Sequence, residues 1–277
     1  MRRPVLILSA AMLLCALAYG IEVAPGCFTS QYVPVGHPQS LGFSFIVSDT
    51  ADKFVIVQIL PPQQALFGVE GYMPIPDVRW FRIGEGETLR ADPDGVFRAQ
   101  MWTDIPADER FYNKHFLVQA LVTGEDLGVW TPVIVVNYFV ETEPRKEVSV
   151  PPYGDMGVAP SVVEVPAENP VGEFSVFNNT DSAMVYKIVV RTPQRESRRA
   201  VNLSPGFAPV PDTSKFVLSP ARIKIPPHQS RKVMVRWLSV GALHSDSEAI
   251  IMVSDQNGNT DFVRFRVKLG SFSPDRR

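Results

Sequence analysis

The sequence predicts an all-β protein made of two antiparallel β-sandwich domains that follow an N-terminal signal peptide. Short runs of alternating apolar and polar residues recur along the chain, and Pro, Gly, Asn and Asp separate them. After the first twenty residues, no stretch has the 3.6-residue period of an amphipathic helix. Removal of those twenty leaves 257 of the 277 residues, a length that suits two domains of common size.

The first twenty residues, MRRPVLILSAAMLLCALAYG, have the pattern of a secretory signal peptide. Arg2 and Arg3 give a positive start, an apolar run follows, and Ala18 and Gly20 are small residues at positions that a signal peptidase recognises. The apolar run is shorter than the roughly 20 residues that a membrane-spanning helix needs. We therefore expect cleavage after Gly20 or Ala18, and a periplasmic or extracellular mature protein without a membrane span. Retention as an uncleaved anchor is the alternative.

The two halves of the mature chain carry opposite net charges. Residues 22–150 hold 9 Lys and Arg against 17 Asp and Glu, a net charge of −8, whereas residues 151–277 hold 16 against 12, a net charge of +4. This asymmetry lets the domains attract each other, or lets one of them face a charged partner. Neither half has the clustered basic residues of a nucleic-acid-binding protein. Cys15 leaves with the signal peptide, so Cys27 has no partner for an intrachain disulfide.

We predict a signal peptide at 1–20, an acidic β-sandwich at 21–143, a Pro-containing linker at 144–157, a second sandwich at 158–270 and a tail at 271–277. In the first domain, strands are expected at Ser40–Val47, Phe54–Leu60, Val78–Ile83, Val96–Trp102, Phe116–Val122 and Val133–Val140. In the second, they are expected at Ser161–Val165, Glu173–Phe177, Met184–Val190, Phe216–Leu218, Arg222–Ile225, Lys232–Leu238, Ala249–Val253 and Phe262–Leu269. Seven or eight strands in about 120 residues are typical of an immunoglobulin-like sandwich. Asn257-Gly258, between two alternating runs, predicts a hairpin.

Basic residues alternate with apolar ones in several of the expected strands of the second domain. Successive side chains of a strand point to opposite faces, so an inward apolar set leaves the basic set on the outer face. The pattern predicts a half-buried sheet whose solvent face is cationic. Such a face either protects the sheet against edge-to-edge aggregation, or holds a carboxylate, an acidic peptide or the acidic first domain. The candidate partner-binding residues are Arg222, Lys224, Arg236, Arg264, Arg266 and Lys268.

Four pieces of the second domain resemble one known group of proteins. The run from Phe216 through Ser219-Pro220 and Ile225-Pro226-Pro227 to Arg236 is similar to the N-terminal domain of periplasmic pilus chaperones of the PapD type, and to the wider PapD-like group that includes major sperm protein. Phe174–Thr180 and Phe265–Leu269 resemble the second and last strands of that domain. The resemblance covers residues 158–270 and implies an immunoglobulin-like fold.

The resemblance implies a function only in part. Pilus chaperones hold a subunit's terminal carboxylate with an Arg on the first strand and a Lys on the last, and they lend that last strand to the subunit. Lys268 stands where the family Lys would, but Ser161–Val165 holds Glu164 and no Arg. The extra domain also precedes this one instead of following it. We therefore expect a protein that acts by protein–protein contacts, as a chaperone or assembly factor for envelope or pilus components.

The sequence holds no motif of a catalytic or metal-binding site. The four His have no metal-ligand spacing, and there is no G-x-S-x-G, phosphate loop or dinucleotide fingerprint. The acidic run at 85–94 lacks the D-x-D-x-D-G order of a Ca²⁺ loop. We expect no enzyme activity, cofactor or metal. Two alternatives stay open: a structural subunit or adhesin of the envelope or a surface appendage, and a ligand- or Ca²⁺-binding module in the first domain.

Overall fold

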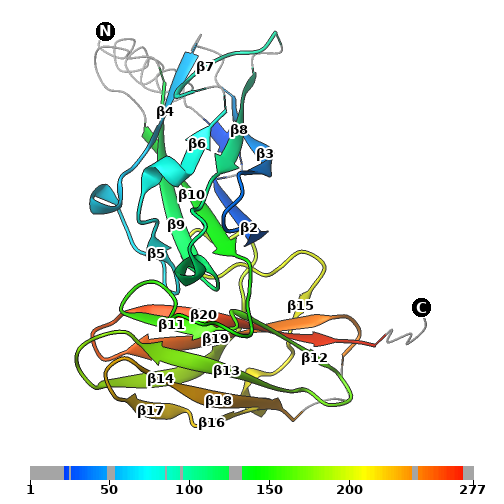
Figure 1. Ribbon diagram of the computed structural model, residues 1–277. Coiled ribbons are helices and arrows are strands. Elements are labelled where there is room, and N and C mark those ends of the chain that lie inside the picture. Colours follow the sequence, from blue (N-terminus) through cyan, green and yellow to red (C-terminus); the bar gives the residue numbers. More distant parts are fainter. Residues whose placement is uncertain are drawn as a thin grey trace, which may run out of the picture.

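The computed structural model describes residues 22–24, 26–48, 54–84, 86–93, 96–124, 133–238 and 243–270. The predicted signal peptide and C-terminal tail lie outside these residues. The all-β prediction is confirmed, because the described elements are β-strands, connecting loops and short 3₁₀ turns. Figure 1 shows two bodies, one of which stands end-on upon the broad face of the other. No helix in the described ranges has the length and apolar character needed to cross a membrane.

The N-terminal sandwich consists of two sheets that enclose one apolar core. The four-stranded sheet has the order β1-β3-β8-β6, and the six-stranded sheet has the order β2-β10-β9-β4-β7 with β5 beside β9. Phe97, Phe116 and Tyr138 are among the fully buried side chains between them. The strands are β1 (Glu22–Ala24), β2 (Cys27–Val33), β3 (Gln39–Ser48), β4 (Phe54–Ile59), β5 (Met73–Pro74), β6 (Phe81–Ile83), β7 (Thr88–Arg90), β8 (Val96–Thr103), β9 (His115–Thr123) and β10 (Val133–Thr142).

The C-terminal sandwich repeats this arrangement around its own core. Its sheets have the orders β11-β13-β18-β16 and β12-β20-β19-β14-β17, with β15 beside β19. Phe174, Trp237 and Phe265 are buried between them. The strands are β11 (Met156–Ala159), β12 (Val162–Pro166), β13 (Val171–Asn178), β14 (Met184–Arg191), β15 (Ala208–Pro209), β16 (Phe216–Ser219), β17 (Arg222–Ile225), β18 (Gln229–Trp237), β19 (Ser247–Asp255) and β20 (Thr260–Lys268).

The two sandwiches have one topology, because each strand from β1 to β10 has its counterpart ten places later in the same sheet position. A short sequence repeat accompanies this equivalence. Ile75-Pro76-Asp77 precedes Phe81, and Val210-Pro211-Asp212 precedes Phe216. In both copies the Asp side chain accepts a hydrogen bond from a backbone amide two residues on, at 2.9 and 2.8 Å, and starts a 3₁₀ turn (Val78–Trp80 and Thr213–Lys215). The sequence resemblance covered only the second copy.

Each expected strand has a counterpart, but several short strands escape the sequence pattern. β2 (CFTSQYV) lacks clean alternation, and β11 lies partly within the predicted linker, at Met156–Ala159. The limits of the two domains therefore stay predictions. The hairpin between β19 and β20 is present: Gly258 has a φ of +89°, and the Asp255 carboxylate accepts hydrogen bonds from the amides of Asn257 and Asn259 at 2.8 and 2.9 Å.

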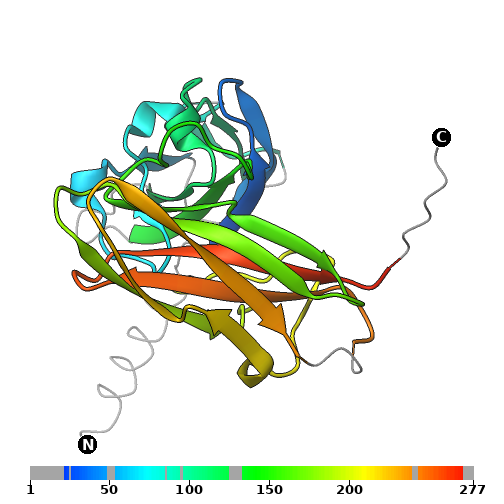
Figure 2. The ribbon, with the colours of Figure 1, turned by 60° about the horizontal axis from the view of Figure 1, so that its bottom comes forward.

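A third apolar cluster joins the two sandwiches. Figures 1 and 2 place β20 on the side of the C-terminal sandwich that faces the N-terminal one. There Tyr72 and Phe139 of the first sandwich pack with Met252 and Phe262 of the second. The segment before β15 also reaches the first sandwich, where the Asn202 side chain donates to Thr29 Oγ1 at 3.2 Å. The outer face of β19 and β20 is consequently an internal surface of the molecule.

Candidate functional site

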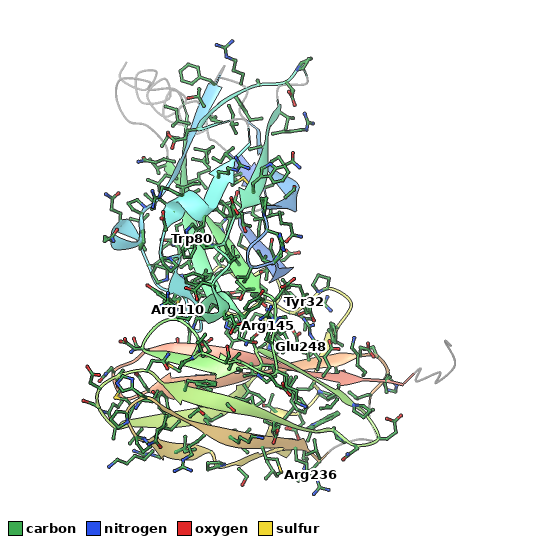
Figure 3. The ribbon with its side chains drawn as sticks, viewed as in Figure 1. Tyr32, Trp80, Arg110, Arg145, Arg236 and Glu248 are labelled. Carbon is green, nitrogen blue, oxygen red and sulfur yellow. The ribbon has the colours of Figure 1, made fainter. Side chains whose placement is uncertain are left out.

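The structure distributes the six predicted partner-binding residues over separate parts of the C-terminal sandwich. All lie on strands at the positions that alternation predicts, but the strands belong to both sheets. In Figure 3, Arg236 lies far from the junction at which Glu248 and Tyr32 are labelled. The six residues are Arg264 and Arg266 at the junction, Lys268 at its rim, Arg222 and Lys224 on the edge strand β17, and Arg236 on the opposite sheet.

Arg264 and Arg266 do not face solvent, and the expectation of a solvated cationic face is wrong for both. Their exposed fractions are 0 % and 2 %. The alternation of β20 was predicted correctly, but the N-terminal sandwich covers the outer face that water was expected to cover. Strand alternation separates two faces and does not state what lies upon either of them.

Arg264 is the centre of a buried ionic network between the sandwiches. Its Nε and Nη2 donate to the two carboxylate oxygens of Glu141, both at 2.6 Å. Its Nη1 donates to Glu248 Oε1 at 2.7 Å and to the Asn202 carbonyl at 2.9 Å. The Tyr72 hydroxyl donates to Glu141 at 2.6 Å. Glu141 is the penultimate residue of β10, so the ligand of this cation is the acidic first domain, one of the three occupants that the sequence left open.

Arg266 extends the network from the same strand. Its Nε donates to Glu248 Oε2 at 2.9 Å, so that the one carboxylate serves both arginines. Its Nη2 donates to Ser204 Oγ and to Gln31 Oε1, each at 2.8 Å, and its Nη1 donates to the Tyr32 hydroxyl. Because Gln31 and Tyr32 belong to β2, Arg266 also links the two sandwiches.

A second buried ionic group lies beside the first. Asp261 Oδ1 is 2.6 Å from His115 Nδ1, and Asp261 Oδ2 is 3.3 Å from Lys114 Nζ. The His115 ring stacks on Phe262 with a centroid separation of 3.7 Å. Apart from His115, the three buried cations of the junction match its three buried carboxylates. The side chains counted here are Lys114, Arg264, Arg266, Glu141, Glu248 and Asp261.

Neighbouring charges hold Glu141 and Asp261 in the ionised form. Burial works against the charged form of Glu141, but the Arg264 charge and its hydrogen bonds outweigh burial and lower the pKa of Glu141. Burial opposes ionisation of Asp261 in the same way, and Lys114 with His115 lowers the pKa of Asp261. Burial, followed by the Glu141 charge, raises the pKa of Tyr72 well above its ordinary value. Tyr72 is therefore a neutral donor to an ionised carboxylate.

Two other predicted residues are exposed in different surroundings. Lys268 Nζ lies 3.1 Å from Asp246 Oδ2 and 4.4 Å from the centroid of the Phe207 ring, so an acid within the molecule already neutralises it. Arg236 is exposed on the outer face of the four-stranded sheet, between Val171 and Val217 on the neighbouring strands. Neither residue adjoins a second unpaired cation among the candidates.

Arg222 and Lys224 form the third surface, together with a residue that sequence reasoning did not single out. Lys187 of β14 lies directly opposite Arg222 of β17, and all three side chains are exposed. Within the described ranges, none of the three forms an ion pair. We call Lys187, Arg222 and Lys224 the β17 cationic edge.

A cavity of about 590 Å³ opens where the sandwiches meet. Three segments line it, 68–74, 153–156 and 258–261, together with Lys114 and His115. The buried charged side chains in its wall pair with one another, as described above. In the part of the chain that the structure describes, no group of three or more His, Cys, Asp or Glu is arranged to hold a metal ion.

Sequence reasoning missed the acidic partners in the junction. Each of these acids lies within or beside a largely apolar run, where a carboxylate is unusual; they are Glu141, Glu248 and Asp261. A buried carboxylate requires a cation or several donors. An acid in such a run therefore signals a buried carboxylate with a cationic partner. No pattern in the sequence identifies that partner, because Glu141 and Arg264 are 123 positions apart.

No protein-family model matches the sequence, and no curated protein was found to match it. Solved structures do match. The CupB2 chaperone of Pseudomonas aeruginosa is 10 % identical with a TM-score of 0.31, over 41 % of this chain and 55 % of that one. The Escherichia coli chaperone DraB is 13 % identical with a TM-score of 0.31, over 91 % and 99 %. A PapD-like domain of human CEP192 is 14 % identical with a TM-score of 0.30, over 46 % and 92 %.

These matches include PapD-like proteins, the group that residues 158–270 resemble in sequence. The matched part spans little more than half of the CupB2 chaperone. At these identities and TM-scores, the matches say nothing of what this chain binds.

Proposed function

We propose that this protein is a non-enzymatic, exported factor that acts through protein–protein contacts, as a PapD-like chaperone or assembly factor for envelope components. The observation that carries the proposal is the β17 cationic edge, where Arg222 and Lys224 stand on an edge strand without an acidic partner in the described ranges. An unneutralised charge row on a sheet edge suits recognition of an acidic protein segment.

The other predicted residues have different parts in this proposal. Arg264 and Arg266 hold the two sandwiches in one orientation, because both reach residues of the N-terminal sandwich from β20. Arg222 and Lys224 contact the partner. Lys268, which Asp246 already neutralises, and Arg236, which lies on the opposite sheet, make no contact with the partner in this proposal. Residues 1–20 support export to the periplasm or to the outside of the cell.

Affinity capture from the envelope fraction of the source cells tests this function. The bait is the mature protein, in the wild-type form and with Arg222→Glu and Lys224→Glu combined. The matched control combines Arg231→Glu and Arg236→Glu, which makes the same charge change on exposed residues of β18. We expect exported proteins to co-elute with the wild type and the control at low salt, and to be lost at high salt and from the β17 variant.

Two outcomes contradict the proposal. Capture that is the same for the wild type and the β17 variant removes the β17 edge as the partner surface. Recovery of the protein alone, as a series of large assemblies in size-exclusion chromatography, points to the structural-subunit alternative.

A further inference from the structure

We infer that β17 is an acceptor edge, at which an extended segment of the partner with alternating acidic and apolar residues adds as a further strand of the six-stranded sheet. The inference rests on the proposed function and specifies the contact that it requires. Three features of β17 define the segment that binds: its charge, its free backbone groups and the alternation of its side chains.

The backbone of β17 has polar groups that point away from β14, toward the open edge of the sheet. β17 ends the strand order and pairs with β14 on one side. Ile188 N–H donates to the Ala221 carbonyl at 2.9 Å, which fixes the phase of the antiparallel ladder. Hydrogen-bonded and non-hydrogen-bonded pairs alternate along such a ladder, so Lys187 with Arg222 is a non-hydrogen-bonded pair. The N–H and C=O groups of Arg222 and Lys224 therefore point to the open edge.

The side chains of the same two residues leave that edge electrostatically incomplete. Arg222 and Lys224 are two positions apart and share one face of the sheet. Lys187 is directly opposite Arg222, in the type of pair that brings side chains closest. Like charges in this position destabilise a sheet. Carboxylates on an added strand would lie beside this row of cations and remove the repulsion.

The opposite face of β17 sets the apolar half of the pattern. Ile225 is buried and Ile223 is partly buried against the core. A strand that adds to β17 places alternate residues beside Ile223, where an apolar side chain completes the cover of the core edge. The remaining residues lie beside Arg222 and Lys224. The segment that fits has Glu or Asp at every second position and Val or Ile between them.

Three other edges of the described sheets lack this combination. The β12 edge holds the acidic Glu164, which lies 3.4 Å from Arg266. The β16 edge presents Val217 and Ser219, and β7 combines Arg90 with a neutral Thr88. Lysine on an edge strand commonly serves only to prevent aggregation. That simpler role predicts no binding of an extended acidic segment, so the two accounts differ in a measurable way.

The test uses the mature full-length protein and a fluorescent synthetic peptide in which Glu and Val alternate over about eight residues, a common strand length. Fluorescence anisotropy measures its binding. One control peptide has the same composition with all Glu in one block. Two further peptides carry N-methyl groups on alternate backbone amides, in the two possible phases, so that one phase blocks the amides that face β17. The protein variants are Arg222→Glu with Lys224→Glu, Lys224→Pro, and the β18 control Arg231→Glu with Arg236→Glu.

We expect the alternating peptide to bind the wild type and the β18 control equally, and to lose about tenfold or more in affinity with the β17 charge reversal, given the modest value of each exposed ion pair. Lys224→Pro removes an outward N–H and should weaken binding further, because proline blocks strand addition at an edge. Only one of the two N-methylated phases should retain binding. The peptide analogues keep the test valid if the proline variant fails to fold.

Equal binding of the block peptide and of both N-methylated phases would overturn strand addition, because it leaves charge attraction alone. Absence of binding by the alternating peptide, with envelope capture still dependent on Arg222 and Lys224, overturns this inference and leaves the proposed function. Binding of the alternating peptide without capture of any envelope protein leaves strand addition at β17 and overturns the proposed function.

Discussion

At the scale of single residues, Arg264 shows why a cation on a strand need not be a surface residue. Its guanidinium donates to Glu141 through two atoms and to Glu248 through a third, and the side chain has no exposed surface. The planar guanidinium fits such bidentate contacts and is weakly hydrated for a cation, which reduces the cost of its burial. Loss of either partner leaves an uncompensated charge in the interior.

We predict that Arg264→Ala lowers the free energy of unfolding by about 3–5 kcal/mol, because Glu141 then remains buried without its cation and Glu248 keeps only Arg266. Urea denaturation measures the change. Arg236→Ala is the matched control on an exposed strand position, and it should change stability by less than about 0.5 kcal/mol. A loss for Arg264→Ala no larger than that of the control would contradict the network.

The lowered pKa values of Glu141 and Asp261 predict how stability depends on pH. A carboxyl group whose pKa is lower in the folded protein stabilises the fold above the unfolded pKa, and this contribution is lost as the pH falls through the folded pKa. The ordinary pKa of Glu141 is 4.5 and that of Asp261 is 3.8. Stability should therefore be constant above about pH 5.5 with respect to these groups, and fall steadily below about pH 4.

Glu141→Gln assigns part of that pH dependence to one residue. The variant should be less stable than the wild type at pH 7, since Arg264 loses one of its two charged partners. The difference should narrow on acidification, because a protonated Glu141 resembles Gln. Urea denaturation at several pH values gives the free energy of unfolding of each protein as a function of pH. Parallel curves for the two proteins would contradict an ionised Glu141 in the folded wild type.

At the scale of elements, the close approach of β12 and β13 depends on Gly172. A Cβ atom built on Gly172 would lie 2.4 Å from Val163 Cγ1 and 3.2 Å from the Phe265 ring. Val163 belongs to one sheet of the C-terminal sandwich and Gly172 to the other. The absence of a side chain thus sets the distance between the sheets at this edge.

We predict that Gly172→Ala destabilises the protein by about 1–3 kcal/mol through overpacking. Gly68→Ala is the control, because no atom lies within 4 Å of its added Cβ and its backbone is not in the left-handed region. Thermal unfolding of the two variants measures the contrast. Equal melting temperatures would mean that β12 shifts away from β13 at little cost.

At the scale of the whole molecule, the apolar cluster and the ionic network between the sandwiches couple their stabilities. Tyr72, Phe139, Met252 and Phe262 come from both sandwiches and are buried only where the sandwiches meet. Separation of the sandwiches would also expose the buried charges to water or leave them without their partners. Separate unfolding of one sandwich therefore carries an additional cost.

We predict one cooperative unfolding transition for the mature protein, although chains of this size with two sandwiches often show two. Differential scanning calorimetry should give equal calorimetric and van't Hoff enthalpies. Phe262→Ala, which removes a ring that contacts both His115 and Tyr72, should split the transition, whereas Met234→Ala on the exposed face should not. Two transitions in the wild type would refute the coupling.

The sequence by itself determined the class of fold, the strands with clear alternation and the β19–β20 hairpin, since local backbone preferences and a two-residue period specify these features. It also placed Arg222, Lys224 and Arg264 on the outer sides of their strands. The tertiary structure alone decided which outer side meets water and which meets the other sandwich. Glu141 and Arg264 are 123 positions apart, and only the docking of two folded sandwiches brings such residues into contact. The docked sandwich covers the outer face of β19 and β20. It leaves the β17 edge open, because β17 lies at the end of the strand order, beyond β14.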